Sequence, residues 1–316
     1  MEQEMNQSYE KNFKETHTLV DNTEEAGAKR FSVIPHWKPV ELRPDYSPVS
    51  STKETLRRYL ALERKINMTK NKKLKQGYEA SIRKNIASGM LVKYGRFEDL
   101  KETFMNAYPI EGQEEKFVAL APSHLVVQDK DSHPIRLTVD YTTLNNFFSK
   151  ASNMLNSIES KVLEMRAHKF VIGMDISKQY HMIMSQHAHS QCILHRDHPN
   201  QPLDVYLHCG LIMGHISSSS LAGLCMIQTG RNFDDLLQKA RNQTIDHKEV
   251  YAPLSYALKE GILKPSTLPT NFSLEKLIRN SLYADNLIIC KDSPSELGKD
   301  CLLYTSDAAD DTPCVD

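Results

Sequence analysis

The fold is decided by two short stretches, Phe170-Val-Ile-Gly-Met-Asp175-Ile-Ser-Lys-Gln-Tyr180 and Ser281-Leu-Tyr283-Ala-Asp285-Asn286-Leu-Ile-Ile-Cys290. Each places an aspartate beside an apolar, β-branched run, which predicts a buried strand with a carboxylate at one end or at a hairpin tip. A buried carboxylate is costly unless a cation or a hydrogen-bond network neutralises it. Two such strands laid side by side would let their aspartates hold divalent metal ions for phosphoryl transfer.

The composition is that of an ordinary folded protein. The chain has 316 residues, of which 40% are hydrophobic and 25% charged, enough for one large domain or two smaller ones. No apolar run approaches the length of about 18 residues that predicts a membrane span, and the first residues do not resemble a signal peptide. The six cysteines form no Cys-x-x-Cys pair, and because no signal peptide is recognised we expect a reduced, cytoplasmic environment.

The formal charge of −1 conceals a strongly basic segment. Between Lys53 and Lys101 there are 14 Lys and Arg against 5 Asp and Glu, a local balance of 14 − 5 = +9. Such a segment is typical of a surface that binds a phosphate backbone. The alternative is a solvated helix with a charged face.

Periodicity and turn residues predict an α+β fold. Residues 1–50 are polar and rich in proline, and we interpret them as a linker or a loosely attached arm that Phe31 and Trp37 anchor locally. We then expect two basic helices over 53–89, beginning at Ser51 or Thr52, followed by strands and helices that suit an antiparallel sheet backed by helices. The remaining elements are predicted as a hairpin over 117–140, a helix over 155–167, strands over 168–176 and 203–209, a helix over 217–228 and a hairpin over 282–290.

The last segment, residues 301–316, carries four aspartates and no basic residue. It looks like translated sequencing-adapter read-through, so we exclude it from reasoning about the fold. We accordingly expect the natural chain to continue beyond about residue 300.

Three motifs together resemble a reverse transcriptase. An aspartate followed by an aromatic residue five positions later, and then a Tyr-x-Asp-Asp-like hairpin, is the motif order of the polymerase palm. The run Ile135-Arg136-Leu-Thr-Val-Asp140-Tyr-Thr-Thr-Leu144-Asn145 resembles the fingers motif of the same family. Leu120-Ala-Pro122-Ser-His124-Leu-Val-Val127 is similar to the Leu-Pro-His-x-Val segment of LTR retrotransposons of the BEL/Pao type. A gypsy-like or retroviral relative is the alternative subgroup.

The resemblance implies a right-hand polymerase fold. Residues 51–150 would form a mixed fingers subdomain, and residues 151–300 would form the palm, an antiparallel sheet backed by helices. The implied function is RNA-directed DNA polymerisation, a nucleotidyl transfer that uses two metal ions, Mg²⁺ or Mn²⁺. The implied partners are an RNA or DNA template–primer, deoxynucleoside triphosphates and other parts of a retrotransposon polyprotein, with no membrane. The implied place of action is the cytoplasm, in virus-like particles.

The resemblance also assigns roles to individual residues. Asp175 and Asp285 would bind the metal ions, with Asn286 beside them in the catalytic group. Three residues would bind the incoming nucleotide: Arg136, Lys130 and Tyr180, the last reading its sugar. Gly214 and Gln228 would lie near the template.

The sequence departs from the family pattern at several positions. Asn286 stands where the second aspartate of the hairpin is expected, so the site loses a unit of negative charge and this copy is expected to be weakened or inactive. Met213-Gly214-His215-Ile216-Ser217-Ser218 replaces a Phe-Gly and Ser-Pro pattern. The alternative function is therefore a non-catalytic nucleic-acid-binding remnant of a decayed element.

A group of histidines and cysteines suggests a third hypothesis, a zinc-dependent module. Zinc favours these residue types, but four ligands on one straight helix cannot surround one ion. A polar hairpin is the simpler interpretation. The residues concerned are His187, His189, Cys192, His195, His198, His208 and Cys209.

Overall fold

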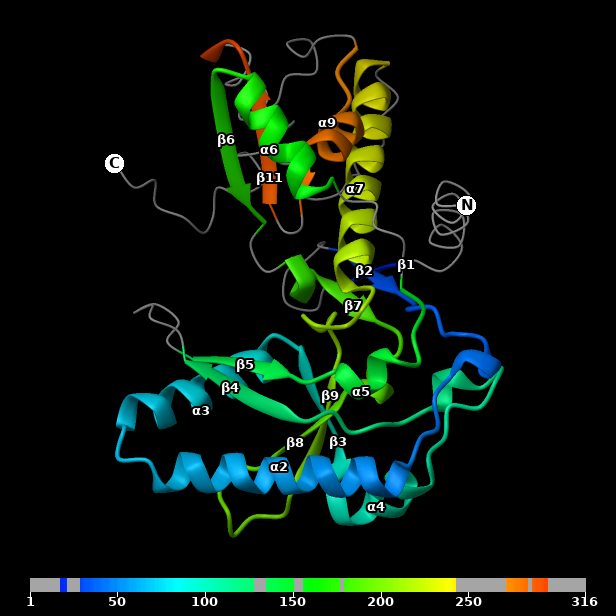
Figure 1. Cartoon of the computed structure of the whole chain (residues 1–316), viewed down its shortest axis with the longest axis vertical. Helices are drawn as coiled ribbons and strands as arrows, with labels where there is room; N and C mark the ends of the chain where they lie inside the picture. The colour runs from blue at the N-terminus through cyan, green and yellow to red at the C-terminus, as the bar shows by residue number, and fades with distance from the viewer. Residues whose placement is uncertain are drawn as a thin grey trace.

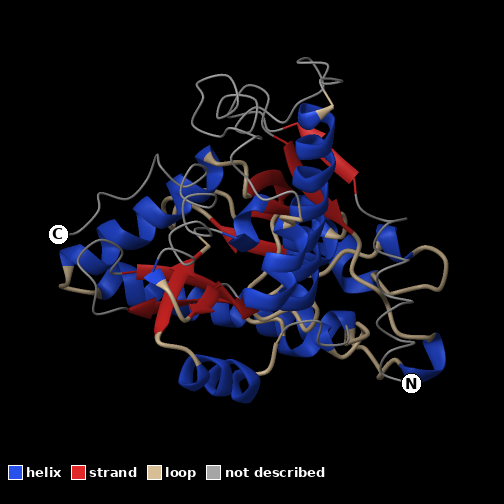
Figure 2. Cartoon of the chain, turned by 90° about the horizontal axis from the view of Figure 1, so that it is seen from above, coloured by secondary structure: helices blue, strands red, loops and turns tan. Residues whose placement is uncertain are grey.

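The computed structural model describes residues 18–21, 29–127, 135–150, 156–176, 179–242, 271–283 and 286–294. It confirms a mixed α+β fold in which small, mainly antiparallel sheets pack with helices. Figure 1 shows a broad lower part and a narrower upper part, with the long helix α7 (Ser218–Arg241) running from the junction up through the upper part. Figure 2 shows the strands in the middle of the molecule with helices around them. In the part of the chain described here, none of the helices has the length and apolarity needed to cross a bilayer.

The lower part holds three long helices, a three-stranded sheet and a separate hairpin. Phe97, Phe104, Phe147 and Phe148 are among the side chains buried where these elements meet. The helices are α2 (Pro48–Met68), α3 (Lys72–Ala87) and α4 (Phe97–Asn106), the sheet has the order β3-β9-β8 (Leu91–Arg96, Asp204–His208, Cys192–His195), and the hairpin pairs β4 (Ser123–Val127) with β5 (Ile135–Val139).

The two basic helices begin and end at recognisable capping residues. Ser47 Oγ accepts the N–H of Ser50 at 3.3 Å, so α2 begins at Pro48, a few residues before the predicted start. Asn71 Oδ1 accepts the N–H of Leu74 at 3.2 Å at the start of α3. Gly89, with φ of 68°, follows the end of α3, as its position in the sequence predicts.

The upper part is a three-stranded antiparallel sheet with helices against it. The strand order is β10-β11-β6, from Leu282–Tyr283, Asn286–Lys291 and Phe170–Asp175. The helices α6 (Ile158–Ala167) and α9 (Leu274–Ser281) both contact β11, and α9 also packs along α7. Leu274, Ile278, Leu282 and Leu287 form the small core of this part together with Ile227 of α7.

Part of the N-terminal arm is packed against the rest of the chain. The strand β1 (Thr18–Asp21) pairs with β2 (Lys29–Val33), and β2 lies parallel to β7 (Ile183–Ser185). Val33 is fully buried, and the ring of Trp37 lies 4.3 Å from that of Phe148. The predicted anchoring by Trp37 is confirmed, but a loose attachment is wrong for β2, because β2 contributes to the core beside α7.

Short helical turns complete the fold. They connect the strands and place several polar side chains described below. Their bounds are η1 Val40–Leu42, η2 Glu114–Lys116, α5 Thr142–Asn145, η3 Gln179–Met182 and η4 Ala188–Gln191.

Three local predictions are corrected. Residues 117–122 are extended but join β8 only through a bridge between Leu120 and Cys192, so the hairpin strand begins at Ser123. Helix α7 runs on to Arg241, well past the predicted end at 228, because α9 covers its second half. The helix predicted over 155–167 begins at Ile158, and α6 exposes its apolar side chains and buries Lys161, whose ammonium group donates to Glu164 and to the carbonyl of Asn280.

Candidate active site

The two acidic stretches that decide the fold lie side by side. Strand β11 pairs antiparallel with β6 over six residue pairs, and the register sets Asn286 opposite Asp175. Tyr283 pairs with Asn286 across the β10–β11 hairpin. Asp285 lies outside the described residues, between these two positions in the sequence. The strand pairing predicted from the sequence is therefore confirmed at Asp175 and at the immediate neighbour of Asp285.

The environment of Asp175 differs from the prediction of a buried strand. Strand β6 is at the edge of its sheet, most of its side chains are exposed, and Asp175 is exposed with them. The buried strand of the pair is β11, whose Leu287 and Ile289 are almost fully enclosed. The prediction failed because an apolar run shows what a strand can bury but not whether anything covers it. The carboxylate of Asp175 remains accessible to a solvated cation.

Helix α7 holds α9, and through α9 the hairpin that carries Asn286. Asp234 of α7 accepts three hydrogen bonds from the start of α9: from the hydroxyl of Ser273 at 2.7 Å and from the N–H groups of Leu274 at 2.7 Å and Glu275 at 3.1 Å. A carboxylate at a helix N-terminus satisfies free N–H groups and opposes the helix dipole. Because α9 ends at Ser281 and β10 begins at the next residue, this contact positions the hairpin.

Ion pairs reinforce the same contact. Arg231 of α7 and Arg279 of α9 both donate to Oε1 of Glu275, at 2.8 and 2.9 Å. These hydrogen bonds lower the pKa of the Glu275 carboxyl although its burial opposes the shift. Glu275 therefore stays ionised and joins the two helices. The sequence positions of Asp234 and Glu275 gave no indication that these two residues join α7 to α9.

Tyr180 lies at the junction of the two parts. Its hydroxyl is 3.1 Å from Oγ of Ser219, in the first turn of α7, and its ring packs against the cluster that contains Val33 and Ile183. The side chain is half-buried. The tyrosine therefore packs against the core while remaining partly exposed, and it follows Asp175 by five residues, as the motif requires.

A loop before α7 is fixed by one asparagine side chain. Asn145 Nδ2 donates to the carbonyl of Gly214 at 2.7 Å, and its Oδ1 accepts the N–H of Ile216 at 2.8 Å. Gly214 has φ of +125°, a conformation open to glycine and strained for other residues. The loop thus needs both residues, and Asn145 is a positioning residue to which the sequence motif assigned no role.

The predicted phosphate-binding residue Arg136 reaches this loop. Its Nη1 lies 3.8 Å from Sδ of Met213, and the side chain is exposed on β5. Lys130, the second predicted phosphate contact, lies outside the described residues. The structure therefore brings Arg136 and Gly214 to one loop, and that loop continues into the turn of α7 that contacts Tyr180.

Asp140, in the same 135–145 motif as Arg136, has a structural role. Its Oδ1 accepts the N–H of Thr142 at 3.1 Å, and its Oδ2 receives Nη1 of Arg58 at 2.8 Å. The hydrogen bond from Thr142 and the pairing with Arg58 lower the pKa of the Asp140 carboxyl to about 2. The ionised side chain thereby ties α2 to the turn that leads to Asn145.

Gln228 is not gathered with the other predicted residues. It lies in the middle of α7, half-buried, and its Nε2 donates to Oδ1 of Asn232 at 2.9 Å. At 1.5 Å per residue, it is roughly 15 Å along the helix axis from the end nearest Gly214.

The histidines and cysteines of the zinc hypothesis do not converge. His187 is buried against Trp37, Cys192 donates to the carbonyl of His189, and His195 contacts Tyr78. Burial lowers the pKa of His187 to about 4. Among the described residues no group of three or more His, Cys, Asp or Glu side chains is arranged to hold a metal ion.

Comparison with known proteins assigns neither a family nor a function to the chain. A scan against protein-family models finds no match to the chain, and a search of the curated proteins finds no significant relative.

Proposed function

We propose that this chain is the fingers and palm part of an RNA-directed DNA polymerase from a BEL/Pao-like LTR retrotransposon. The observation that carries the proposal is the register of β6 and β11, which sets Asn286, the neighbour of Asp285, opposite Asp175. The motif order in the sequence required these two strands to meet, although they are far apart in the chain. The lower part, with its basic helices, would be the fingers, and the β10-β11-β6 sheet with its helices would be the palm.

The side chains at the β6–β11 register fit a hard divalent cation. Carboxylate and amide oxygens are the ligands that Mg²⁺ and Mn²⁺ prefer, and Asp175 is an exposed carboxylate paired with an asparagine. Asp175, with Asp285 and the weaker donor Asn286, would hold the metal. When bound, such ions stabilise the charge of the transferring phosphate and activate the attacking hydroxyl.

The remaining residues would bind and orient the substrates. Arg136, which is exposed beside Met213, would bind the triphosphate through its planar guanidinium group. Tyr180 would pack against the sugar of a deoxynucleotide, held in place by its hydroxyl contact to Ser219. Asn145 would keep the Gly214 loop in the shape that faces the template. The template–primer, deoxynucleoside triphosphates and the rest of a polyprotein would be the partners, within virus-like particles in the cell.

Asn286 favours a second candidate function. A site that lacks one carboxylate binds metal less tightly, and the basic segment would still bind nucleic acid. The chain would then be a non-catalytic nucleic-acid-binding remnant.

Primer extension on an RNA template separates the two functions. The parent chain and Asn286→Asp are compared with Mg²⁺ and with Mn²⁺, and Asn280→Asp is the matched control because it adds the same charge at an exposed position of α9. We expect Asn286→Asp to raise extension at least ten-fold, about 1.4 kcal/mol at the transition state, and Asn280→Asp to leave it unchanged. Adding Asp175→Asn to Asn286→Asp should abolish it. RNA binding without extension by any variant would support the remnant instead.

A further inference from the structure

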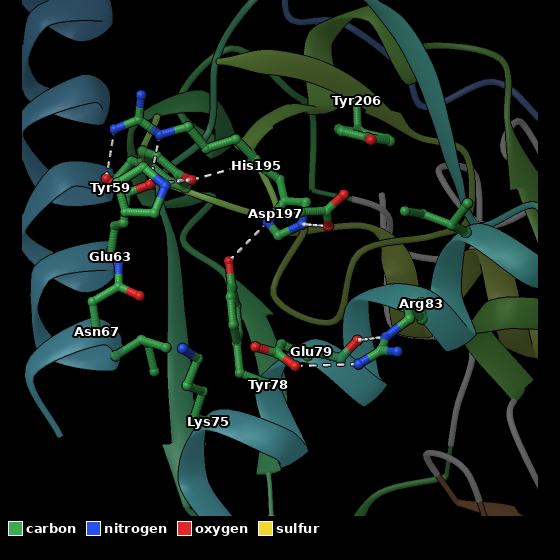
Figure 3. A pocket seen from close by; sticks show the side chains of 14 residues that line it. Tyr59, Glu63, Asn67, Lys75, Tyr78, Glu79, Arg83, His195, Asp197 and Tyr206 are labelled. Carbon is green, nitrogen blue, oxygen red and sulfur yellow. Dashed lines mark hydrogen bonds and ion pairs between the residues drawn. The ribbon is translucent and has the colours of Figure 1, made fainter. Parts of the chain in front are cut away.

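A second candidate site lies in the lower part of the molecule, away from the β6–β11 register. A cavity of about 410 Å³ opens between α2, α3 and the strands β8 and β9 (Figure 3). Cavities of roughly 300–1,000 Å³ are typical of small-ligand sites in proteins. Its lining combines aromatic rings, apolar side chains and charged groups from these four elements and from the loop between β8 and β9.

One wall of the cavity is held rigid by paired charges. Arg196 binds both carboxylate oxygens of Glu63, at 2.6 and 2.7 Å, and its backbone N–H donates to the hydroxyl of Tyr59 at 3.1 Å. These bonds lower the pKa of the Glu63 carboxyl, so the pair stays ionised and internally neutral. The bidentate geometry keeps the wall in place before any ligand enters.

A second network forms the floor. The hydroxyl of Tyr78 is 3.1 Å from Nδ1 of His195, whose Nε2 is 3.3 Å from Oδ1 of Asp197. His195 is buried, and its ring contacts those of Tyr78 and Tyr206, with centroids 5.7 and 6.0 Å away. Figure 3 shows the side chains of Tyr78, His195, Asp197 and Tyr206 around the same opening. Tyr78 and His195 are buried and form the base of the cavity, whereas the partly exposed ring of Tyr206 provides the flat surface on which a planar ligand can stack.

The charged side chains that line the cavity balance in number, with Lys75, Arg83 and Arg196 set against Glu63, Glu79 and Asp197. Glu63 is paired with Arg196, and Glu79 with Arg83. Lys75 also lines the cavity, and in the part of the chain that the structure describes no salt bridge to it is found.

An excess of positive charge lies beside the cavity, along the α2–α3 turn and the helix ends that flank it. From residue 64 to 78 there are six cations and no carboxylate: Arg64, Lys65, Lys70, Lys72, Lys73 and Lys75, all exposed. The turn joins Asn67 to Lys75, and both of these residues line the cavity. A stacking surface bordered by a row of cations is the combination that single-stranded nucleic acids bind.

We propose that this cavity accepts one unpaired nucleotide of a nucleic-acid strand, with its base against Tyr206, Tyr78 and His195 and its phosphates along Lys75 and the α2–α3 turn. The shared chemistry is a planar heterocycle joined to a phosphate, and a free nucleotide has it too. The strand is favoured because a single free nucleotide would not engage cations that extend so far from the cavity. The proposal rests on the proposed function only in that the chain binds nucleic acid; it does not require polymerase activity.

Fluorescence anisotropy of the full chain with a labelled 12-nucleotide single-stranded RNA tests the rim. The assay contains neither metal nor triphosphate, so failure of polymerase activity does not affect it. We expect Lys75→Gln to weaken binding about five-fold and to reduce the salt slope by about one unit. Lys84→Gln is the matched control, because it makes the same change at an exposed position of α3 that does not line the cavity. Equal effects of the two variants would overturn the proposal.

A 2-aminopurine base in the same RNA tests the stacking surface. We expect its fluorescence to be quenched on binding to the parent and to Tyr206→Phe, which keeps the ring, but not on binding to Tyr206→Leu. Quenching by Tyr206→Leu equal to the parent would rule out stacking in the cavity. Adenosine or guanosine monophosphate is then added as a competitor: recovery of fluorescence only at millimolar concentrations supports a strand, whereas recovery at micromolar concentrations would make the free nucleotide the occupant and refute the strand.

Discussion

The contact between α7 and α9 predicts a helix glycine that alanine cannot replace. Gly230 lies against the first turn of α9, where an added Cβ would be 2.7 Å from Cα of Glu275, 2.8 Å from its backbone nitrogen and 3.1 Å from Cδ1 of Ile278. Carbon atoms normally approach to about 3.5–4.0 Å, so α9 would have to move by roughly 1 Å. A backbone cannot turn aside as the end of a flexible side chain can. The substitution therefore strains the contact that positions the Asn286 hairpin.

Two opposing effects set the size of the change produced by Gly230→Ala. Alanine in a helix interior is favoured over glycine by about 1 kcal/mol. Overpacking of a close contact costs about 1–3 kcal/mol, and displacement of α9 also lengthens the three hydrogen bonds that Asp234 accepts. We expect the second effect to win, with a net loss of about 2 kcal/mol in the free energy of unfolding.

Urea denaturation followed by circular dichroism measures this change. The matched control is Gln238→Ala, an exposed substitution in the same helix that should shift the free energy of unfolding by less than about 0.5 kcal/mol. If Gly230→Ala proves as stable as the parent, or more stable, then α9 does not cross α7 at this closeness and the argument for how the hairpin is positioned fails.

Three further outcomes follow from the same physical reasoning. Asp234→Ala should lower the free energy of unfolding by about 2 kcal/mol in urea titrations, whereas the exposed neighbour change Asp235→Ala should have little effect; equal effects would argue against the helix cap. Because the pKa of Asp140 is lowered to about 2, its stabilisation is complete above the unfolded value of about 4 and is lost as pH falls toward 2. Asp140→Asn should therefore cost about 1 kcal/mol at pH 7 and flatten the stability profile between pH 4 and 2, and an unchanged profile would contradict the pairing with Arg58. Burial lowers the pKa of His215 to about 3. As the pH falls below 6.5, the His215 imidazole is therefore protonated in the unfolded chain but not in the folded one, and the free energy of unfolding decreases as the pH is lowered. His215→Gln should reduce that slope by up to about 1.4 kcal/mol per pH unit between pH 6 and 4, as measured by urea denaturation at each pH; an unchanged slope would show that His215 titrates normally.

Local patterns anticipated much of the secondary structure. The final hairpin, the helices over the basic segment and the strand that ends at Asp175 follow from apolar periodicity, capping residues and glycine, all of which act over a few residues. The lateral pairing of β6 and β11 was also anticipated, because the motif order resembles a polymerase palm in which two aspartate-bearing strands lie side by side.

Which faces of these strands and helices are packed against other elements was not predicted. An apolar run appears the same in a sequence whether or not another element packs on it. The exposure of the edge strand β6 and of the apolar side chains of α6 could therefore not be predicted from the sequence. The same reason explains why α7 was predicted too short: its second half is a helix whose partner, α9, lies more than 30 residues later in the chain.

The sequence by itself determined several of the strands and helices, where the positive charge gathers, and that asparagine stands at position 286. Those properties depend on residue type and short spacing alone. Only the tertiary structure decided that Asn286 faces Asp175, that Asn145 holds the Gly214 loop, that Asp234 caps α9, and that a cavity adjoins the basic turn. Each of these contacts joins residues far apart in the chain, and the free energy of such a contact depends on geometry that no local pattern contains.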